Sequence, residues 1–274
     1  MRPGRRSGPP VAATFSRATA SVVATYNIHR AVGRDGAFDP ERVAAVLAEL
    51  DAHVIALQEV HSGAAGRDLV RLFRDRLAAE SVSGVTMLRR DAEYGNVLLS
   101  RYPVLSVDRL DLSVPPYEPR GALDVVLDCG GWRLRVLATH LGLRPYERRR
   151  QVRRLLSALD DRAELPTVLM GDLNEWFLWG RPLRWLHAQF RRTPAPATFP
   201  ARLPMFALDR MWVRPRAMLD RLAVHASVLA RVASDHLPLV ARLVPRHVAV
   251  AHPSSAPAST APIPAPCSAA SRDR

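Results

Sequence analysis

Short apolar segments of strand length alternate with amphipathic helical segments along most of this chain, and that pattern limits the fold more than any other feature. Residues 40–50 predict a helix, with Asp39 as its N-cap and Pro40 at its first helical position. Two further helices are expected near residues 67–79 and 181–189, and a third at 146–160. Strands are expected at residues 21–29, 53–58, 84–89, 95–100, 104–110, 122–128, 132–139, 167–171, 208–213, 220–225 and 238–244. Because strands follow one another in series between the helices, we expect mixed sheets covered by helices, not a purely parallel sheet.

The two ends of the chain differ in composition from its body. Residues 1–20 are basic and rich in Pro, Gly and Ser, and residues 246–274 are rich in Pro, Ala and Ser. We expect both ends to be flexible or disordered, with one domain at residues 21–245. The N-terminal segment lacks the continuous apolar stretch of a signal peptide, and no apolar run approaches the roughly 18 residues of a membrane helix. A cytoplasmic location is therefore expected, with peripheral membrane association left open.

The formal net charge of +13 suggests an anionic partner. Residues 1–20 contribute +4 and residues 246–274 contribute +2, so the body keeps +7. A phosphate-bearing substrate is consistent with this charge, whether nucleic acid, phospholipid head group or small phosphoester. The charge does not choose among these substrates, and the sequence does not predict the oligomeric state. The two cysteines, Cys129 and Cys267, are too few for a disulfide framework.

Polar side chains stand at or near the ends of several apolar strands. In an α/β protein, ligands bind at the carboxyl ends of strands, so these residues are candidates for a site. Each one taken alone is more often a turn residue or a structural histidine. The candidates are Asn27, Glu59, His140, Asp172, Asn174, Asp209, Asp235 and His236.

Eight short motifs carry these residues in a fixed order. They read TYNIH, LQEV, YGNVLLSRYP, PRGAL, ATHL, GDLN, LDRMW and SDHLPL, and they span residues 22–244. In this order they resemble the endonuclease/exonuclease/phosphatase superfamily, also called deoxyribonuclease-I-like. The resemblance implies a four-layer α/β sandwich, with two mixed sheets packed face to face and helices outside. It also implies hydrolysis of a phosphoester with Mg²⁺ or Mn²⁺.

The resemblance implies that an oxygen-ligated metal binds near Glu59. Hard divalent ions select oxygen donors and neutralise charge on a phosphoryl group. Glu59 is expected to be the principal ligand, and Asn27 is expected to support the metal or the phosphate. Asp235 is expected to lie near the metal, with a water molecule as an alternative link.

Further roles follow from the same resemblance. Asp172 is expected to orient or deprotonate the attacking water, and Asn174 to hold a phosphate oxygen. His236 is expected to contact the phosphoryl group, with Asp209 orienting its ring. An ion pair between Asp209 and Arg210 is the alternative, which we discount because neighbours on a strand face opposite ways.

Two more residues are expected to contact the phosphate. His140 in ATHL resembles the deoxyribonuclease-I, sphingomyelinase and inositol-phosphatase branches of the superfamily, which place two histidines beside the phosphate. It disfavours the abasic-site endonuclease branch, which has Tyr and Asn there. Arg120 in PRGAL resembles a phosphate-binding arginine, and a surface salt bridge is its alternative.

Two segments near the candidate site have several interpretations. The arginines of RPYERRRQVRRLL, from Arg148 to Arg154, predict a solvated helix face, or else a surface that attracts an anionic substrate or a lipid surface. The aromatic residues after GDLN most often close a core, but they also suit substrate stacking or the rim of a membrane-facing mouth. They are Trp176, Phe177 and Trp179.

The sequence leaves three functional hypotheses. The first is a divalent-metal-dependent phosphoesterase, either a phosphodiesterase or a phosphatase, that hydrolyses its substrate with an activated water. The second is a DNA or RNA nuclease, suggested by the basic body. The third is a catalytically silent scaffold that binds a phosphate ligand, which the presence of every expected carboxylate and histidine disfavours.

Overall fold

Two mixed β-sheets form the centre of the computed structural model, which describes residues 20–63, 68–89 and 92–245. The first sheet has the strand order β10-β11-β1-β2-β4-β3, and the second has the order β5-β6-β7-β8-β9. The strands are β1 Ser21–Asn27, β2 Val54–Ser62, β3 Glu80–Arg89, β4 Ala92–Ser100, β5 Val104–Asp111, β6 Gly121–Asp128, β7 Arg133–His140, β8 Thr167–Asp172, β9 Asp209–Arg214, β10 Leu219–Val224 and β11 Leu239–Leu243. Our expectations for the two ends of the chain lie outside the described residues.

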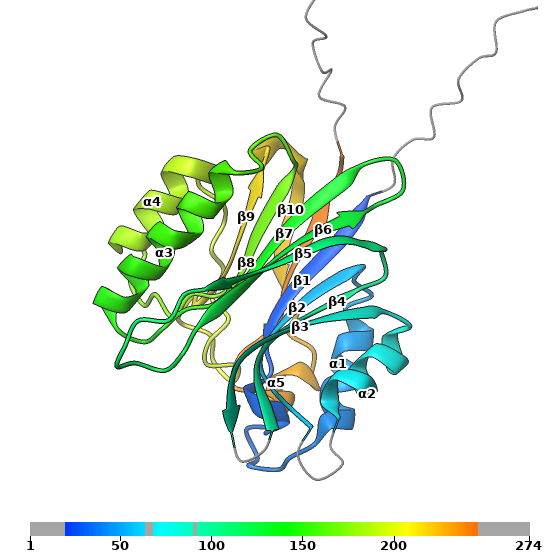
Figure 1. Cartoon of the computed structure of the whole chain (residues 1–274). Coiled ribbons are helices and arrows are strands. Elements are labelled where there is room, and N and C mark those ends of the chain that lie inside the picture. The colour runs from blue at the N-terminus through cyan, green and yellow to red at the C-terminus, as the bar shows by residue number, and fades with distance from the viewer. Residues whose placement is uncertain (1–19, 64–67, 90–91, 246–274) are drawn as a thin grey trace, which may run out of the picture.

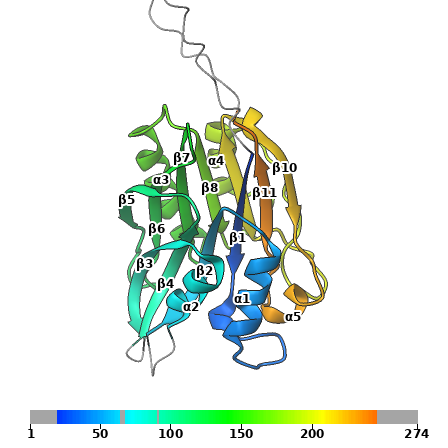
Figure 2. The ribbon, with the colours of Figure 1, turned by 90° about the vertical axis from the view of Figure 1, so that its right-hand side faces the viewer.

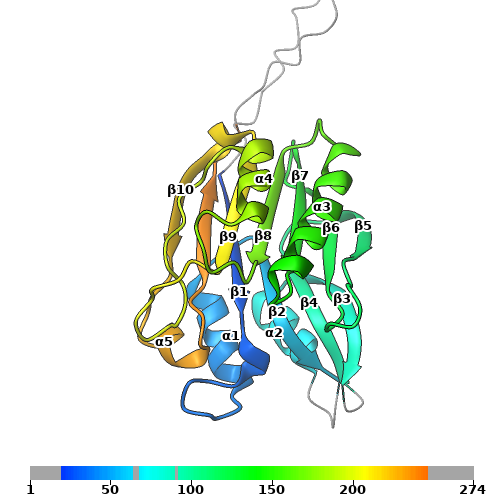
Figure 3. The same cartoon turned by 90° about the vertical axis from the view of Figure 1, so that its left-hand side faces the viewer.

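Helices cover the outer faces of both sheets. The helices are α1 Pro40–Glu49, α2 Leu69–Leu77, α3 Pro145–Asp160, α4 Arg181–Phe190 and the single turn α5 Ala230–Ala233. In Figure 1 the two sheets lie face to face, with α3 and α4 on one outer side and α1 and α2 on the other. Figure 2 shows α1 and α2 in front of the first sheet, and Figure 3 shows α3 and α4 in front of the second. The four-layer α/β sandwich is therefore confirmed.

Three hydrophobic clusters hold the four layers together. The central cluster fills the space between the sheets with side chains such as Val23, Val125 and Met170. A second cluster packs α1 and α2 against the first sheet, and a third packs α3 and α4 against the second. The predicted stripe on α3 belongs to the third cluster: Val152, Leu155 and Leu159 are buried there and Leu156 is partly buried.

Each sheet contains one parallel strand pair, and the two pairs determine where a site forms. Strand β1 runs parallel to β2, and β7 runs parallel to β8, whereas all the other pairings are antiparallel. Helix α1 connects the first pair and α3 connects the second. The carboxyl ends of parallel strands lie at the same edge of a sheet, which is where ligands bind in α/β proteins.

The predicted elements are present, with differences at some boundaries. Asp39 caps α1 as expected, since its Oδ1 accepts a hydrogen bond from the backbone N–H of Arg42 at 2.9 Å. Strand β3 begins at Glu80, four residues before the predicted start, because its pairing with β4 continues to Ser100. Strand β2 continues past residue 58 to Ser62 because an irregularity absorbs residues 58 and 59 and pairing resumes at Val60.

A buried ion pair fastens the end of α3 to the second sheet. Arg135 on β7 donates to both carboxylate oxygens of Asp124 on β6, at 2.9 and 2.6 Å. Its remaining donors reach the carbonyls of Ala158 and Leu159, at 2.7 and 3.2 Å. The guanidinium is thus fully paired inside the protein, where an unpaired charge would be very unfavourable.

None of the helices formed by the described residues has the combination of length and hydrophobicity that a bilayer span requires.

Candidate active site

The carboxyl ends of the two parallel pairs bring the predicted site residues to one pocket. Strand β1 ends at Asn27 and β2 carries Glu59, while β7 ends at His140 and β8 ends at Asp172. In the second sheet, His140 is the register partner of Asp172, and Asp172 is the register partner of Asp209. Residues far apart in the sequence therefore lie side by side because of strand register.

The pocket has a volume of about 380 Å³ and includes every predicted site residue except Asp209 in its lining. Asp209 lies directly behind His236 and is fully buried. The predicted residues that line the pocket are Asn27, Glu59, Arg120, His140, Asp172, Asn174, Asp235 and His236.

A bulge inside β2 directs Glu59 into the pocket. The sequence instead places Glu59 directly after the end of a strand. Regular pairing with β4 stops at Leu57 and resumes at Val60. Glu59 itself has a left-handed backbone, with φ of 57°. A bulge of this kind redirects a side chain, and a strained non-glycine backbone at a pocket is a common feature of functional sites. The carboxylate lines the pocket and is partly exposed.

Asn27 bridges the two sheets at the bottom of the pocket. Its Nδ2 donates to Glu59 Oε1 at 3.2 Å and to Asp172 Oδ2 at 3.1 Å. Its Oδ1 accepts the backbone N–H of His29 at 3.0 Å, which fixes the orientation of the amide. The amide therefore connects the carboxylate on β2 with the carboxylate on β8.

Asn174 reaches the pocket by a turn. Asp172 and Asn174 are two residues apart and would point the same way on an extended chain, but Asn174 has a left-handed backbone with φ of 49°. The backbone N–H of Asn174 donates to Asp172 Oδ1 at 2.9 Å, and its Nδ2 donates to the carbonyl of Leu141 at 2.8 Å. These bonds fix both the carboxylate and the amide.

His140 is held as a neutral imidazole. Arg120 Nη1 lies 3.0 Å from His140 Nδ1, and Asn174 Nδ2 lies 3.1 Å from His140 Nε2, which is also 3.5 Å from Asp172 Oδ2. Because guanidinium and amide nitrogens only donate, donors face both ring nitrogens, which disfavours a charged ring. Burial lowers the pKa of His140 well below its usual value, and the charges of Arg120 and His236 lower it further. Arg120 is buried and also pairs with Glu118 at 3.1 Å, so a surface salt bridge does not describe it.

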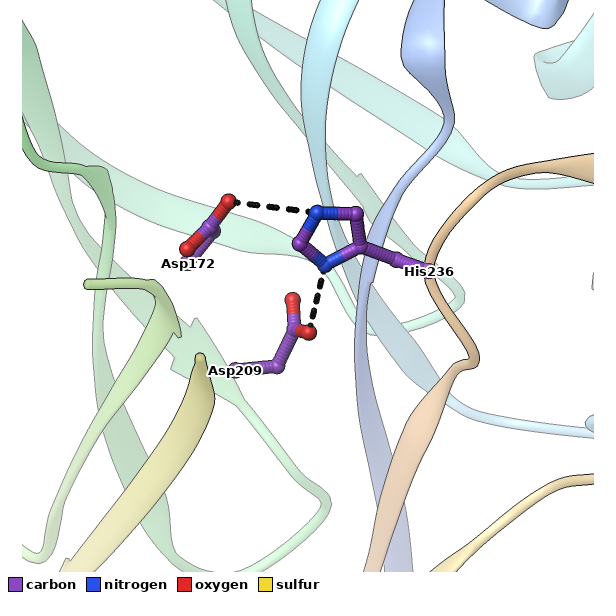
Figure 4. A group of neighbouring side chains, drawn as sticks. All are labelled: Asp172, Asp209 and His236. Carbon is purple, nitrogen blue, oxygen red and sulfur yellow. Dashed lines mark hydrogen bonds and ion pairs between the residues drawn. The ribbon is translucent and has the colours of Figure 1, made fainter. Parts of the chain in front are cut away.

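His236 lies between two carboxylates and is held as an imidazolium. Its Nδ1 lies 2.8 Å from Asp209 Oδ2, and its Nε2 lies 3.7 Å from Asp172 Oδ2 (Figure 4). Burial by itself would lower the pKa of His236, but the charges of Asp209 and Asp172 outweigh burial and raise it to about 10. The two histidines beside Asp172 thus have different charges, His140 neutral and His236 positive.

The protonation of Asp172 is also shifted by its surroundings. Burial raises its pKa from 3.8 to about 6, while the charge of His236 and the hydrogen bonds from Asn174 and Asn27 oppose that rise. A carboxylate with such a pKa is a stronger base than usual and is still mostly ionised at neutral pH.

A model of the Endonuclease/Exonuclease/phosphatase family matches residues 24–236. The chain belongs to this family. The uncharacterized protein YbhP of Escherichia coli (strain K12) is 30% identical over 178 residues, which cover 62% of this chain and 70% of YbhP. Members of the family are metal-dependent phosphoesterases, including nucleases and phosphatases.

Two solved structures show the same fold, and the first is from a protein of this family. A crystal structure of an endonuclease/exonuclease/phosphatase from Beutenbergia cavernae is 28% identical, with a TM-score of 0.70, and covers 82% of this chain and 71% of its own. The Bacteroides thetaiotaomicron mannosyl-6-phosphatase Bt3783 is 17% identical, with a TM-score of 0.65, and covers 82% of this chain and 99% of its own. At that lower identity the likeness shows the fold alone.

The family's divalent metal has two candidate positions in this chain. Asp172, Asp209 and His236 offer ligand atoms within 4.8 Å of one another. However, the imidazolium of His236 already supplies positive charge between these two carboxylates. The carboxylates of Glu59 and Asp235, which line the same pocket, are a better fit for a hard cation, and Asn27 Nδ2 holds Glu59 in place. Asp235 is less enclosed than the others, with 39% of its side chain exposed.

One buried ion pair at the site was not predicted. Arg148, expected on a solvated helix face, is buried at the start of α3, and its Nε donates to Glu175 Oε2 at 3.2 Å. Its Nη1 donates to the carbonyl of Leu143 at 2.6 Å. The pair joins the loop after β7 to the loop after β8, next to Asn174. Helical periodicity identifies Arg148, because it lies four residues before Val152 and seven before Leu155 on the buried face.

Other expectations near the site have mixed outcomes. Arg150, Arg153 and Arg154 are exposed, as a solvated helix face predicts. Arg210 does not pair with Asp209; its Nε donates to the carbonyl of Ala207 at 2.6 Å. The expectation that the aromatic residues after GDLN close a core is wrong, since Trp179 is 72% exposed.

Proposed function

We propose that this chain hydrolyses a phosphoester with the help of Mg²⁺ or Mn²⁺ and a water molecule activated by Asp172. The observation that carries the proposal is the environment of Asp172: one carboxylate oxygen lies near the neutral ring of His140, the charged ring of His236 and the amide of Asn27. A base with an adjusted pKa, placed beside both neutral and charged donors, is the arrangement that phosphoryl transfer to water requires.

In this proposal Glu59 and Asp235 hold the metal at the exposed side of the pocket, and Asn27 supports the metal by orienting Glu59 through its Nδ2. When bound there, the ion would neutralise charge on the phosphoryl oxygens and lower the pKa of a bound water. Glu59 is suited to this role because its bulge presents the carboxylate to the pocket and its Oε1 is already oriented by Asn27. The amide of Asn27 then couples the metal-binding group to Asp172.

The protein's own groups perform the proton and charge steps. Asp172 accepts the proton of the attacking water, for which its pKa of about 6 makes it suitable at neutral pH. His236 places an imidazolium where negative charge develops on the phosphoryl group. His140 Nε2–H and Asn174 Nδ2 donate to the phosphoryl oxygens, which requires each of them to turn from its present partner toward the substrate.

Two residues act through others. Asp209 lies outside the pocket lining and orients and charges His236. Arg120 donates to Nδ1 of His140, and when Asn174 turns from Nε2 to the substrate, the ring proton is on Nε2 and is directed toward the pocket. Arg120 also lines the pocket and is suited to contact a phosphate oxygen directly.

The test uses purified full-length protein and two soluble substrates, bis(p-nitrophenyl) phosphate as the diester and p-nitrophenyl phosphate as the monoester. We expect release of p-nitrophenol with Mg²⁺ or Mn²⁺ and none with EDTA. In Asp172→Asn, loss of the general base should lower the rate on the order of 10²- to 10⁴-fold. Glu59→Gln should raise the metal concentration needed for half-maximal rate. Asp128→Asn is the matched control, because Asp128 is exposed at the opposite end of β6.

Equal rates in wild type and in the Asp172 and Glu59 variants would contradict the proposal. Metal binding without turnover of these and a wider set of nucleic-acid, sugar-phosphate and inositol-phosphate substrates would favour the silent scaffold. Plasmid DNA belongs in the same series, because the net charge of +13 favours a polyanion. Absence of nicking at low salt would exclude the nuclease.

A further inference from the structure

Large hydrophobic side chains are concentrated on the surface beside the pocket. They come from three segments: the loop after β7 with the start of α3, the loop after β8, and the turn that follows Phe199. Together we call them the apolar rim. Its members, all exposed, are Leu143, Tyr146, Trp176, Phe177, Leu178, Trp179, Leu203 and Met205.

The three segments of the apolar rim are joined to one another by direct contacts. Arg148 binds the carbonyl of Leu143 and the carboxylate of Glu175, which connects the first segment to the second. Trp176 packs edge-on against Phe206 and Phe199, with ring centroids 4.9 and 5.8 Å apart, which connects the second to the third. These contacts hold the three segments of the rim next to one another.

The apolar rim adjoins the mouth of the catalytic pocket. Leu143 and Trp176 belong both to the rim and to the lining of the pocket. Phe199, against which Trp176 packs, also lines the pocket, and its ring lies 4.8 Å from that of His236. A partner that covers the rim therefore lies next to His236, the residue proposed to contact the phosphoryl group.

The rim carries positive charge and exposes no acid. Exposed arginines lie next to its hydrophobic residues: Arg144 follows Leu143, Arg202 precedes Leu203, and Arg181 begins α4. These three guanidinium groups form no ion pair among the described residues. The two acids within the same segments, Glu147 and Glu175, are both buried. The rim is thus both hydrophobic and cationic.

A surface of this composition matches one kind of partner better than others. Groups of large exposed apolar side chains mark interaction sites, because water-exposed apolar surface is unfavourable. Tryptophan and tyrosine favour the interface of a bilayer, leucine and methionine favour its acyl region, and arginine pairs with anionic head groups. Single-stranded nucleic acid also binds aromatic residues and arginines, but its bases stack on flat rings and make poor use of Leu143, Leu178, Leu203 and Met205.

We propose that the apolar rim docks on the surface of an anionic phospholipid bilayer and so holds the mouth of the pocket at the level of the lipid head groups. The docking does not depend on turnover. The implication that head-group phosphoesters are the substrate class rests on the proposed hydrolysis.

The experiment measures co-sedimentation of the full chain with vesicles, in the presence of EDTA so that nothing is hydrolysed. We expect binding to vesicles of phosphatidylcholine mixed with phosphatidylglycerol, and much weaker binding to phosphatidylcholine alone. Replacing Leu178, Trp179, Leu203 and Met205 together by Ser should lower the partition coefficient on the order of 10⁴-fold, since each apolar side chain that enters the bilayer contributes about tenfold. Replacing Arg144, Arg181 and Arg202 together by Gln should abolish the preference for the anionic lipid.

Matched controls lie at the far end of the sandwich. Leu105→Ser removes an exposed leucine next to Val104, whose strand-register partner on β6 is Leu127. Arg133→Gln removes an exposed arginine whose register partner on β6 is Asp128. Both positions are at the end of the second sheet opposite His140. Both controls should sediment with vesicles like wild type, and thermal unfolding followed by circular dichroism should show that every variant is folded.

The outcomes separate docking from catalysis. Equal sedimentation of wild type and the serine variant, or equal binding to both kinds of vesicle, would overturn the docking proposal. So would rim-dependent self-association or rim-dependent binding of single-stranded DNA in the absence of vesicle binding. Asp172→Asn should still bind vesicles. If vesicles are not bound while soluble phosphoesters are hydrolysed, the docking proposal fails and the proposed function stands; vesicle binding without any hydrolysis gives the reverse result.

Discussion

Replacing Asp209 by asparagine removes the most effective of the negative charges that keep His236 protonated, while it preserves the shape of the side chain. In the wild type, Asp209 Oδ2 lies 2.8 Å from His236 Nδ1. Burial favours the neutral ring, and Asp209 is the largest of the causes that oppose it. The resulting rise in the pKa of His236 from 6.5 to about 10 corresponds to about 5 kcal/mol in favour of the charged form.

Without the charge of Asp209, we expect the pKa of His236 to fall from about 10 toward its ordinary value of 6.5, because only Asp172 and Asp235 then oppose the effect of burial. At a pKa of 6.5 the ring would be charged at pH 8 in about one molecule in thirty. If the imidazolium stabilises the phosphoryl group, hydrolysis at pH 8 should decrease on the order of 30-fold. The ratio of wild-type to variant rate should become smaller as the pH is lowered toward 6, because the variant ring regains its proton.

Two measurements test this reasoning. The first is an NMR titration of the histidine rings in the metal-free protein, with the His236 signal assigned by comparison with His236→Gln. The second is the pH dependence of bis(p-nitrophenyl) phosphate hydrolysis. Thr198→Val is the matched control, because Thr198 Oγ1 donates to the same oxygen of Asp209 at 2.6 Å and its loss leaves the charge of Asp209 in place.

Stability should follow the same linkage. The folded pKa of His236 lies above its unfolded value, so its contribution to the free energy of unfolding is complete below pH 6.5 and is lost as the pH rises toward about 10. In Asp209→Asn this pH dependence should disappear. A His236 pKa that remains near 10 in the variant, or a loss of activity by the same factor at every pH, would refute the reasoning.

Three further predictions concern the fold and its buried groups. Asp124→Asn leaves the buried guanidinium of Arg135 without a charged partner and should lower the free energy of unfolding in urea by about 3–5 kcal/mol. The control Asp220→Asn breaks the exposed pair with Arg242 and should lower it by less than about 1 kcal/mol. Similar losses in the two variants would show that burial of the first pair is unimportant. Asp39→Ala removes the N-cap of α1 and should destabilise the protein by about 1 kcal/mol, and an unchanged urea midpoint would argue against the cap. Burial raises the pKa of the Cys129 thiol to about 12. In a Cys267→Ser protein, Cys129 should therefore react with Ellman's reagent at pH 8 only after unfolding. Fast reaction in the native state would contradict the burial of Cys129.

The layers of the fold and most of the pocket lining followed from local patterns. Apolar strands, an Asp39-Pro40 helix start and helical spacing on α3 each report on neighbours within a few residues, and the structure has these elements. The polar residues at strand ends were identifiable because a carboxylate or an imidazole beside an apolar strand is unusual unless a site needs it. The family resemblance then assigned the metal side to Glu59 and the water side to Asp172.

Other features were not visible in local patterns. The spacing of Arg148 places it on the buried face of α3, but its partner Glu175 comes from a distant loop and no local pattern identifies the pair. Glu59 was expected at a strand end, whereas a bulge holds it inside β2. The aromatic residues after GDLN were expected to close a core, because exposure depends on whether another element covers them.

The sequence by itself determined which chemical groups are available and that they belong to strands and helices of a known family. Only the tertiary structure decided how these groups are protonated and paired. The register of β7, β8 and β9 places His140, Asp172 and Asp209 in adjacent positions. Burial, together with the charge of Arg120, then keeps His140 neutral, and Asp209 with Asp172 keeps His236 charged. The physical reason is that burial and charge act over a few ångströms in space, and the residues concerned are brought within that distance only by folding.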